Sequence, residues 1–117
     1  MELKEVYEKI GGDYDDVVRR LMGEKLVRKF LLKFLDDKSY ADLGRTLSEG
    51  DYKEAFRAAH TLKGVCLNLG FTELYKVSAE LTEVLRGRET AGSDELYAQV
   101  KEQYTTLTDA IRELAGN

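Results

Sequence analysis

Residues 51–69 read DYKEAFRAAHTLKGVCLNL, and their spacing predicts one long helix. Asp51 is the predicted N-cap, and Gly70 ends the helix. Each helical residue advances about 100° around the axis, which places a set of small and medium side chains on one narrow stripe. This stripe consists of Ala55, Ala59, Leu62, Cys66 and Leu69. We expect it to be the face of the helix that packs into a core.

The same helical spacing of apolar residues extends over the rest of the chain. We expect short N-terminal helices within residues 3–21 and bundle helices at about 24–49, 51–69, 72–86 and 93–115. The polar segment 36–38 interrupts the first of these bundle helices, which is therefore one bent helix or two pieces. Helices of this length joined by short connections pack as antiparallel neighbours. Residues 1–117 thus predict a single all-α domain, an up-and-down antiparallel four-helix bundle with short additional N-terminal helices.

Composition excludes several classes of protein. The chain has no Pro and only 10 Gly among 117 residues, which favours long helices over a turn-rich sheet. Its 18 Lys and Arg against 22 Asp and Glu give a net charge of −4, which argues against binding to nucleic acids or anionic membranes. The single cysteine rules out an internal disulfide and a Cys-rich metal site. The charged start, and the lack of any stretch that could span a membrane, favour a cytoplasmic protein.

The only histidine of the chain, His60, lies on the outer side of the central helix. On the helical wheel it stands about 140° from Ala55, away from the core stripe. Gly64 follows one turn later, and a glycine inside a helix costs about 0.5–1 kcal/mol relative to alanine. A glycine at this place indicates that another molecule approaches the backbone closely beside the imidazole.

Charged and apolar side chains flank this histidine at helical spacing. Lys63 and Arg57 bring positive charge, which favours a bound anion over a metal cation. Phe56 and Leu67 lie off the core stripe and could form the apolar part of a docking surface. Each has a plainer interpretation as well: the two cations as part of a solvated charged face, and Phe56 as a contact with a neighbouring helix.

The run AAHTLKGVCLNLG, residues 58–70, resembles the signature of histidine-containing phosphotransfer (Hpt) domains of phosphorelays. The core of that signature, His-x-x-Lys-Gly, is present as His60, Lys63 and Gly64, and a further glycine stands at position 70. The likeness covers about residues 11–87 well, while the final helix matches only in character.

Two residues depart from the family pattern. Val65 and Cys66 stand where the family usually has small residues such as Ser, Ala or Gly. Both project toward the core side of the helical wheel, so we expect them to alter packing rather than transfer chemistry. Leu67 makes the surface beyond the glycine apolar, which bears on the choice of partner.

The resemblance implies a phosphocarrier rather than an enzyme with its own turnover. His60 would accept a phosphoryl group from the aspartyl phosphate of a receiver domain and pass it to another response regulator. Lys63 would neutralise the phosphate charge, together with Arg57, and Gly64 would give the partner access to the ring. The implied partners are receiver domains and a hybrid sensor histidine kinase. The chain itself would hold no cofactor or metal, because Mg²⁺ belongs to the receiver in this family.

Other functions compete with this one. A helical docking module could bind receiver domains without accepting phosphate. A metalloenzyme or other hydrolase is disfavoured, because the chain has one histidine and neither a His-x-x-x-His nor a Glu-x-x-His pattern. The absence of a Gly-rich nucleotide loop argues against a self-contained kinase. The oligomeric state, and whether the domain is free-standing or part of a larger kinase, stay open.

Overall fold

A computed structural model describes residues 1–87 and 90–116 of the chain. These residues form helices and no strands, and helix accounts for 81% of the structure, which confirms the all-α prediction. In chain order the helices are α1 (Leu3–Lys9), α2 (Tyr14–Arg20), α3 (Glu24–Phe34), α4 (Ser39–Ser48), α5 (Tyr52–Leu69), α6 (Thr72–Arg86) and α7 (Ser93–Gly116). Arg88 and Glu89, between α6 and α7, and Asn117, within the predicted domain, lie outside the described residues.

The range 24–49, predicted as one bundle helix or two pieces, forms two helices. Helix α3 ends at Phe34, and α4 begins at Ser39. Between them, Asp37 Oδ1 accepts a hydrogen bond of 2.8 Å from the backbone N–H of Ser39. An aspartate side chain that bonds to nearby backbone N–H groups competes with the helical hydrogen bonds, so the chain breaks here.

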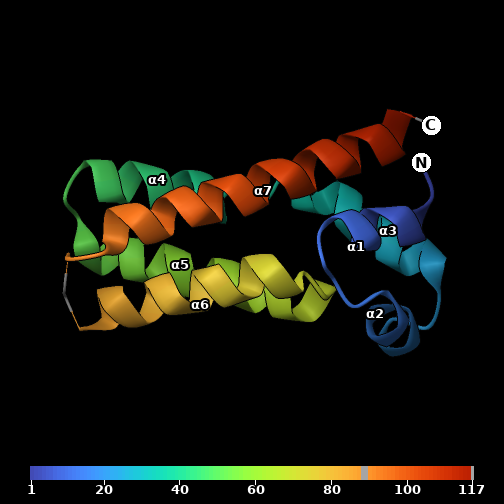
Figure 1. Ribbon diagram of the computed structural model, residues 1–117, viewed down its shortest axis with the longest axis horizontal. Helices are drawn as coiled ribbons and strands as arrows, with labels where there is room; N and C mark the ends of the chain where they lie inside the picture. The colour runs from blue at the N-terminus through green and yellow to red at the C-terminus, as the bar shows by residue number, and fades with distance from the viewer. Residues whose placement is uncertain (88–89, 117) are drawn as a thin grey trace.

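The helices α4, α5, α6 and α7 lie alongside one another and form the long body of the molecule (Figure 1). Helix α5 packs between α4 and α6, and α6 packs against α7. Helices α4 and α7 meet through the stacked rings of Tyr40 and Tyr104, whose centroids are 3.8 Å apart. Helices α1, α2 and α3 gather at the end where α5 and α7 terminate (Figure 1). None of the described helices combines the length and hydropathy of a membrane span.

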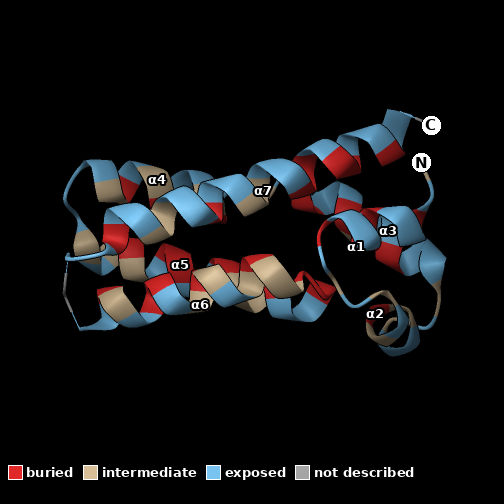
Figure 2. Ribbon diagram, viewed as in Figure 1, coloured by how far each residue is buried: buried red, intermediate tan, exposed pale blue. Residues whose placement is uncertain are grey.

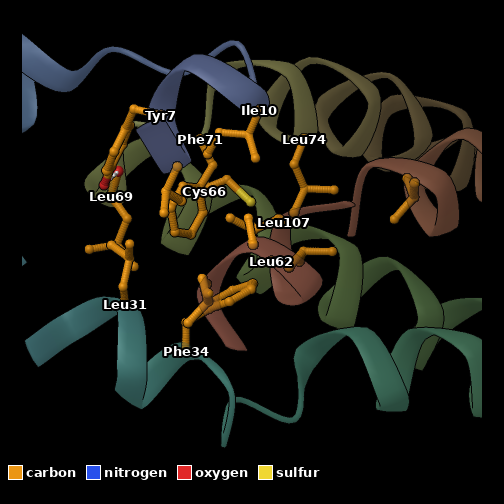
Figure 3. Close-up of a cluster of buried hydrophobic side chains, with 14 of the residues drawn as sticks. Tyr7, Ile10, Leu31, Phe34, Leu62, Cys66, Leu69, Phe71, Leu74 and Leu107 are labelled. Carbon is orange, nitrogen blue, oxygen red and sulfur yellow. Dashed lines mark hydrogen bonds between the residues drawn. The ribbon is translucent and has the colours of Figure 1, made fainter. Parts of the chain in front are cut away.

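The buried residues line the inner faces of these helices (Figure 2). The predicted stripe of α5 is confirmed, because Ala55, Ala59, Leu62 and Cys66 are fully buried. Side chains from α1, α3, α6 and α7 surround it, so the short N-terminal helices close one end of the same core (Figure 3). The position of α5 is therefore set by packing on its inner face.

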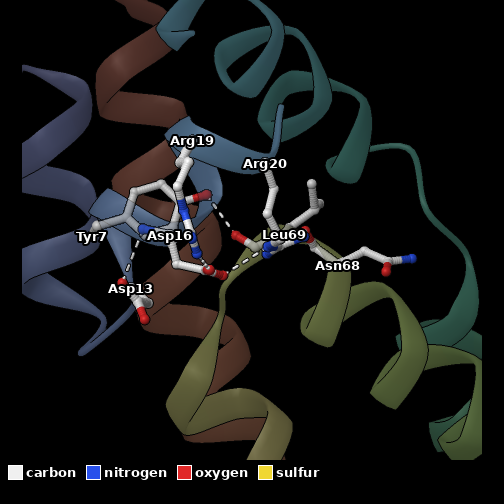
Figure 4. A network of polar contacts seen from close by, with 7 residues as sticks. All are labelled: Tyr7, Asp13, Asp16, Arg19, Arg20, Asn68 and Leu69. Carbon is white, nitrogen blue, oxygen red and sulfur yellow. Dashed lines mark hydrogen bonds and ion pairs between the residues drawn. The ribbon is translucent and has the colours of Figure 1, made fainter. Parts of the chain in front are cut away.

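The carboxyl end of α5 is also tied to the N-terminal helices (Figure 4). The Tyr7 hydroxyl donates a hydrogen bond of 2.6 Å to the carbonyl of Leu69. Arg20 Nη1 donates to the carbonyl of Asn68 at 3.1 Å, and its Nε pairs with Asp16 at 2.7 Å. The last carbonyls of a helix have no partner within the helix, so these bonds from α1 and α2 stabilise its end.

Two residues cap α5. At its start, Asp51 Oδ1 accepts a hydrogen bond from the backbone N–H of Glu54 at 3.3 Å, as predicted for the N-cap. At its end, Gly70 takes the left-handed conformation with φ 72°, which residues with a side chain rarely adopt. Helix α5 is thus held at both ends and along its inner face, and only its outer face is left free.

Candidate functional site

His60 lies on the exposed outer face of α5, as its place on the helical wheel predicts. Two polar side chains close to it in sequence, Thr61 and Arg57, make contacts with other groups. Thr61 Oγ1 donates to the carbonyl of Arg57 at 3.0 Å, and Arg57 Nη1 pairs with Glu54 Oε1 at 3.0 Å. The imidazole is therefore open to an approaching molecule.

Gly64 leaves the backbone of α5 uncovered one turn after the histidine. A Cβ atom built at this glycine would meet no atom within 4 Å beyond its own turn of helix. Its conformation is that of the regular helix around it. Neither the packing nor the backbone conformation of the described chain requires a glycine here. Alanine would make the helix more stable, so the structure gives no reason for the glycine.

Phe56 lies one turn before the histidine and contacts it directly. The two rings are inclined by 14°, with their centroids 6.0 Å apart. Phe56 is half-buried and packs against the core, and the Cζ atom of Arg86 lies 4.9 Å from the centroid of its ring. The contact with a neighbouring helix that the sequence left open for Phe56 is therefore made, through Arg86 at the end of α6.

The other predicted site residues share this face of α5. Lys63 is half-buried, whereas Arg57 is exposed and its guanidinium is paired with Glu54. Leu67 leaves 59% of its surface exposed, unusually much for a leucine, beside a cleft that Tyr75 and Asp16 also line. The structure thus places the histidine, both cations, the bare glycine and an apolar side chain on the outer side of one helix.

No three His, Cys, Asp or Glu side chains come together as a metal site among residues 1–87 and 90–116. The thiol of Cys66 is fully buried, and this burial raises its pKa well above the ordinary value for cysteine. A buried thiol that stays protonated is a poor nucleophile. Cys66 is therefore set apart from the outer face, both by its burial and by its protonation.

Arg86 is the residue beside the site that sequence reasoning missed. Its signal was available in the order of the helices, since α5 and α6 are joined by a short turn at Gly70 and Phe71. Two antiparallel helices with such a connection bring the start of the first opposite the end of the second. Phe56 and Arg86 stand at those two places and meet.

Comparison with known proteins adds one finding. The sequence model of the Hpt domain family matches residues 28–114, most of the chain. The match includes the whole of α4, α5 and α6, with His60, Lys63 and Gly64, and it leaves out α1 and α2. No curated protein and no solved structure gave a significant match.

Proposed function

This chain belongs to the Hpt domain family, and from that premise we propose that it is a phosphocarrier of a two-component phosphorelay. His60 accepts a phosphoryl group from the aspartyl phosphate of a receiver domain and passes it to another response regulator. The observation that carries the proposal is the exposed imidazole beside a glycine that the fold does not need. An ordinary surface histidine would have no reason to stand next to such a gap.

The chemistry asks for a nucleophile and for positive charge. A lone pair of the imidazole forms an N–P bond while the P–O bond to the aspartate breaks. The carboxylate leaves with the electron pair of the broken P–O bond. Histidine is one of the side chains that form covalent intermediates as nucleophiles in group-transfer reactions. Phosphoryl transfer further needs in-line positioning and neutralised charge. In this proposal Lys63 supplies the charge, with Arg57 as a second cation, and Gly64 leaves room for the receiver.

The remaining features of the proposal concern its setting. The carrier acts in the cytoplasm, with receiver domains as partners and a hybrid sensor histidine kinase as a source of phosphate. It has no turnover alone and holds no cofactor, since the Mg²⁺ of the reaction belongs to the receiver. An up-and-down four-helix bundle is the scaffold in which α5 presents the histidine. Leu67 and the other outward side chains of α5 supply the surface on which the receiver docks.

A docking module that binds receivers without accepting phosphate is the second candidate, which the exposed Leu67 supports by itself. Incubation with a phosphorylated receiver domain separates the two functions. We expect the phosphoryl group to move to the wild-type chain and not to His60→Gln, while both bind the receiver with similar affinity. Binding without transfer to the wild type would establish the docking module instead.

A further inference from the structure

The contact between Phe56 and His60 affects the orientation of the imidazole as well as the packing of the helix surface. The phenylalanine precedes the histidine by four residues, and helical side chains lean toward the amino end, over the preceding turn. The imidazole lies beside Phe56 as this lean predicts: the ring centroids are 6.0 Å apart, and the two planes are inclined by only 14°. Leaning toward Phe56 takes the ring away from Gly64 and leaves the glycine backbone free.

Phe56 is itself held in place from α6. The Cζ atom of Arg86 lies 4.9 Å from the centroid of the phenyl ring, within the range of a cation–π contact. Arg86 in turn pairs with Glu83 Oε2 at 3.2 Å, one turn earlier on the same helix. The phenyl ring is therefore held between the core and Arg86, whereas an exposed histidine without such a neighbour would exchange among several rotamers.

Stacking suits this histidine because of where its lone pair lies. The nucleophilic lone pair of an imidazole is in the plane of the ring, so a neighbour parallel to the ring covers a face and leaves the nitrogen free. A leucine at position 56 could fill the same half-buried space, but it has no flat surface to set the angle of the imidazole. The phenyl ring thus makes two contacts that a leucine could not, the cation–π contact with Arg86 and a flat surface beside the imidazole.

We propose that Phe56, held by Arg86, is a positioning residue that keeps the His60 imidazole in one orientation for phosphoryl transfer. This inference rests on the proposed function. It assigns to Phe56 a role inside the domain in addition to any contact with a partner. The stack prepares the geometry before the donor arrives, which reduces the loss of side-chain freedom on encounter.

Phosphoramidate tests this role without a partner protein. It is a small donor whose nitrogen leaves in its protonated form: the imidazole lone pair forms a new N–P bond, the N–P bond of the protonated phosphoramidate breaks, and ammonia leaves with the electron pair of the broken bond. The full chain is compared with Phe56→Leu, with Phe56→Tyr, which retains the flat ring, and with Arg86→Gln. Phe30→Leu is the matched control, because Phe30 is also half-buried and carries Lys33 5.8 Å from its ring centroid, but lies on α3.

Two readouts are followed, the rate of phosphorylation and the proton resonances of the imidazole. A single histidine makes those resonances unambiguous. We expect the wild-type resonances to lie upfield from the ring current of Phe56 and to move to free-histidine values in Phe56→Leu. The rate should fall about two- to tenfold in Phe56→Leu, and less in Arg86→Gln. Phe56→Tyr should match the wild type in both the resonances and the rate, and so should Phe30→Leu.

The results separate this inference from the proposed function. Unchanged resonances and an unchanged rate in Phe56→Leu would overturn the positioning role and leave the phosphocarrier intact. A wild-type chain that takes no phosphoryl group on His60 would overturn both. Should Phe56→Leu lose its fold in a thermal unfolding scan, the exposed Arg86→Gln decides instead: resonances and rate equal to wild type would overturn the inference.

Discussion

The two faces of α5 follow different rules. On the inner face, Leu62 and Cys66 are fully buried, and their size and apolar character follow from the core they fill. On the outer face, Gly64 sits where nothing crowds a side chain, and Leu67 leaves 59% of its surface exposed. Stability explains the first face and not the second. Residues that the fold does not need mark the surface on which we propose that this protein acts.

The largest expected effect lies on the inner face. Leu62→Ala removes a fully buried side chain and leaves a cavity, so the free energy of unfolding should fall by about 2–5 kcal/mol. Phosphoryl acceptance per folded molecule should stay at the wild-type level, because the outer face is unchanged. Denaturant unfolding and phosphorylation by phosphoramidate measure the two quantities. A stable variant, or one whose folded molecules no longer accept phosphate, would break the division between the faces.

Lys63→Gln tests the outer face, where we expect a substitution to slow phosphoryl transfer and leave stability nearly unchanged. Removing the cation nearest to His60 on the carboxyl side should slow transfer from a phosphorylated receiver about ten- to hundredfold. The free energy of unfolding should change by no more than about 0.5 kcal/mol, as for other surface substitutions. Lys53→Gln, an exposed lysine in the first turn of the same helix, is the matched control. Equal slowing in both variants would mean that general positive charge, rather than Lys63, is responsible.

The two glycines of the signature sharpen the comparison. Gly70→Ala should destabilise the protein by about 1–2 kcal/mol, because φ is 72° there and the new Cβ would lie 3.2 Å from the carbonyl oxygen of Asp13. Gly64→Ala should stabilise it by about 0.5–1 kcal/mol and still slow transfer from the receiver. Chemical denaturation measures the change in stability of each variant, and transfer kinetics measure the change in rate. A destabilised Gly64→Ala would show that this glycine serves the fold after all.

The smallest effect concerns the polar contacts at the end of α5. We expect these contacts to contribute to the stability of the fold and not to phosphoryl transfer. Hydrogen bonds from Arg20 and Arg19 hold the pKa of Asp16 below its usual range. A carboxyl whose pKa is lower in the folded state stabilises the fold above its ordinary pKa near 4, and this stabilisation is lost as pH falls through the folded value. The stability difference between wild type and Asp16→Asn should therefore be largest at neutral pH and vanish in acid.

Asp15→Asn, on the same helix, is the control for that measurement. At neutral pH it should change the free energy of unfolding less than Asp16→Asn does, because Arg19 and Arg20 pair with Asp16. A difference in Asp16→Asn that grows toward acid would reverse the sign of the argument. Both variants should accept phosphate at the wild-type rate.

Local periodicity was sufficient to predict the helices and the two faces of α5. The spacing of Ala55, Leu62 and Cys66 predicts the buried stripe, and the angle of His60 on the same wheel predicts its exposure, because both depend only on position along one helix. The same reasoning left the range 24–49 open. A side-chain bond from Asp37 to the backbone decides that break, and hydropathy does not record such a bond.

Contacts between distant segments escaped the sequence reading. The Tyr7 hydroxyl donates to a carbonyl 62 residues away, at the end of α5, and the residues next to Tyr7 in the sequence do not indicate this partner. Arg86 reaches the ring of Phe56 from another helix. Both contacts depend on how the helices are placed in three dimensions, and both act on α5. The sequence predicted which residues share the outer face of α5, and tertiary packing determines how they are held.

The most direct test of the central claim is to locate the phosphoryl group. The wild-type chain is incubated with a phosphorylated receiver domain, kept at neutral pH, and sequenced by tandem mass spectrometry. We predict one phosphoryl group per chain, on His60, with the inner-face residues unmodified. A phosphoryl group on any other residue, or none on a folded chain that binds the receiver, would contradict the assignment of the outer face of α5 as the phosphoacceptor site.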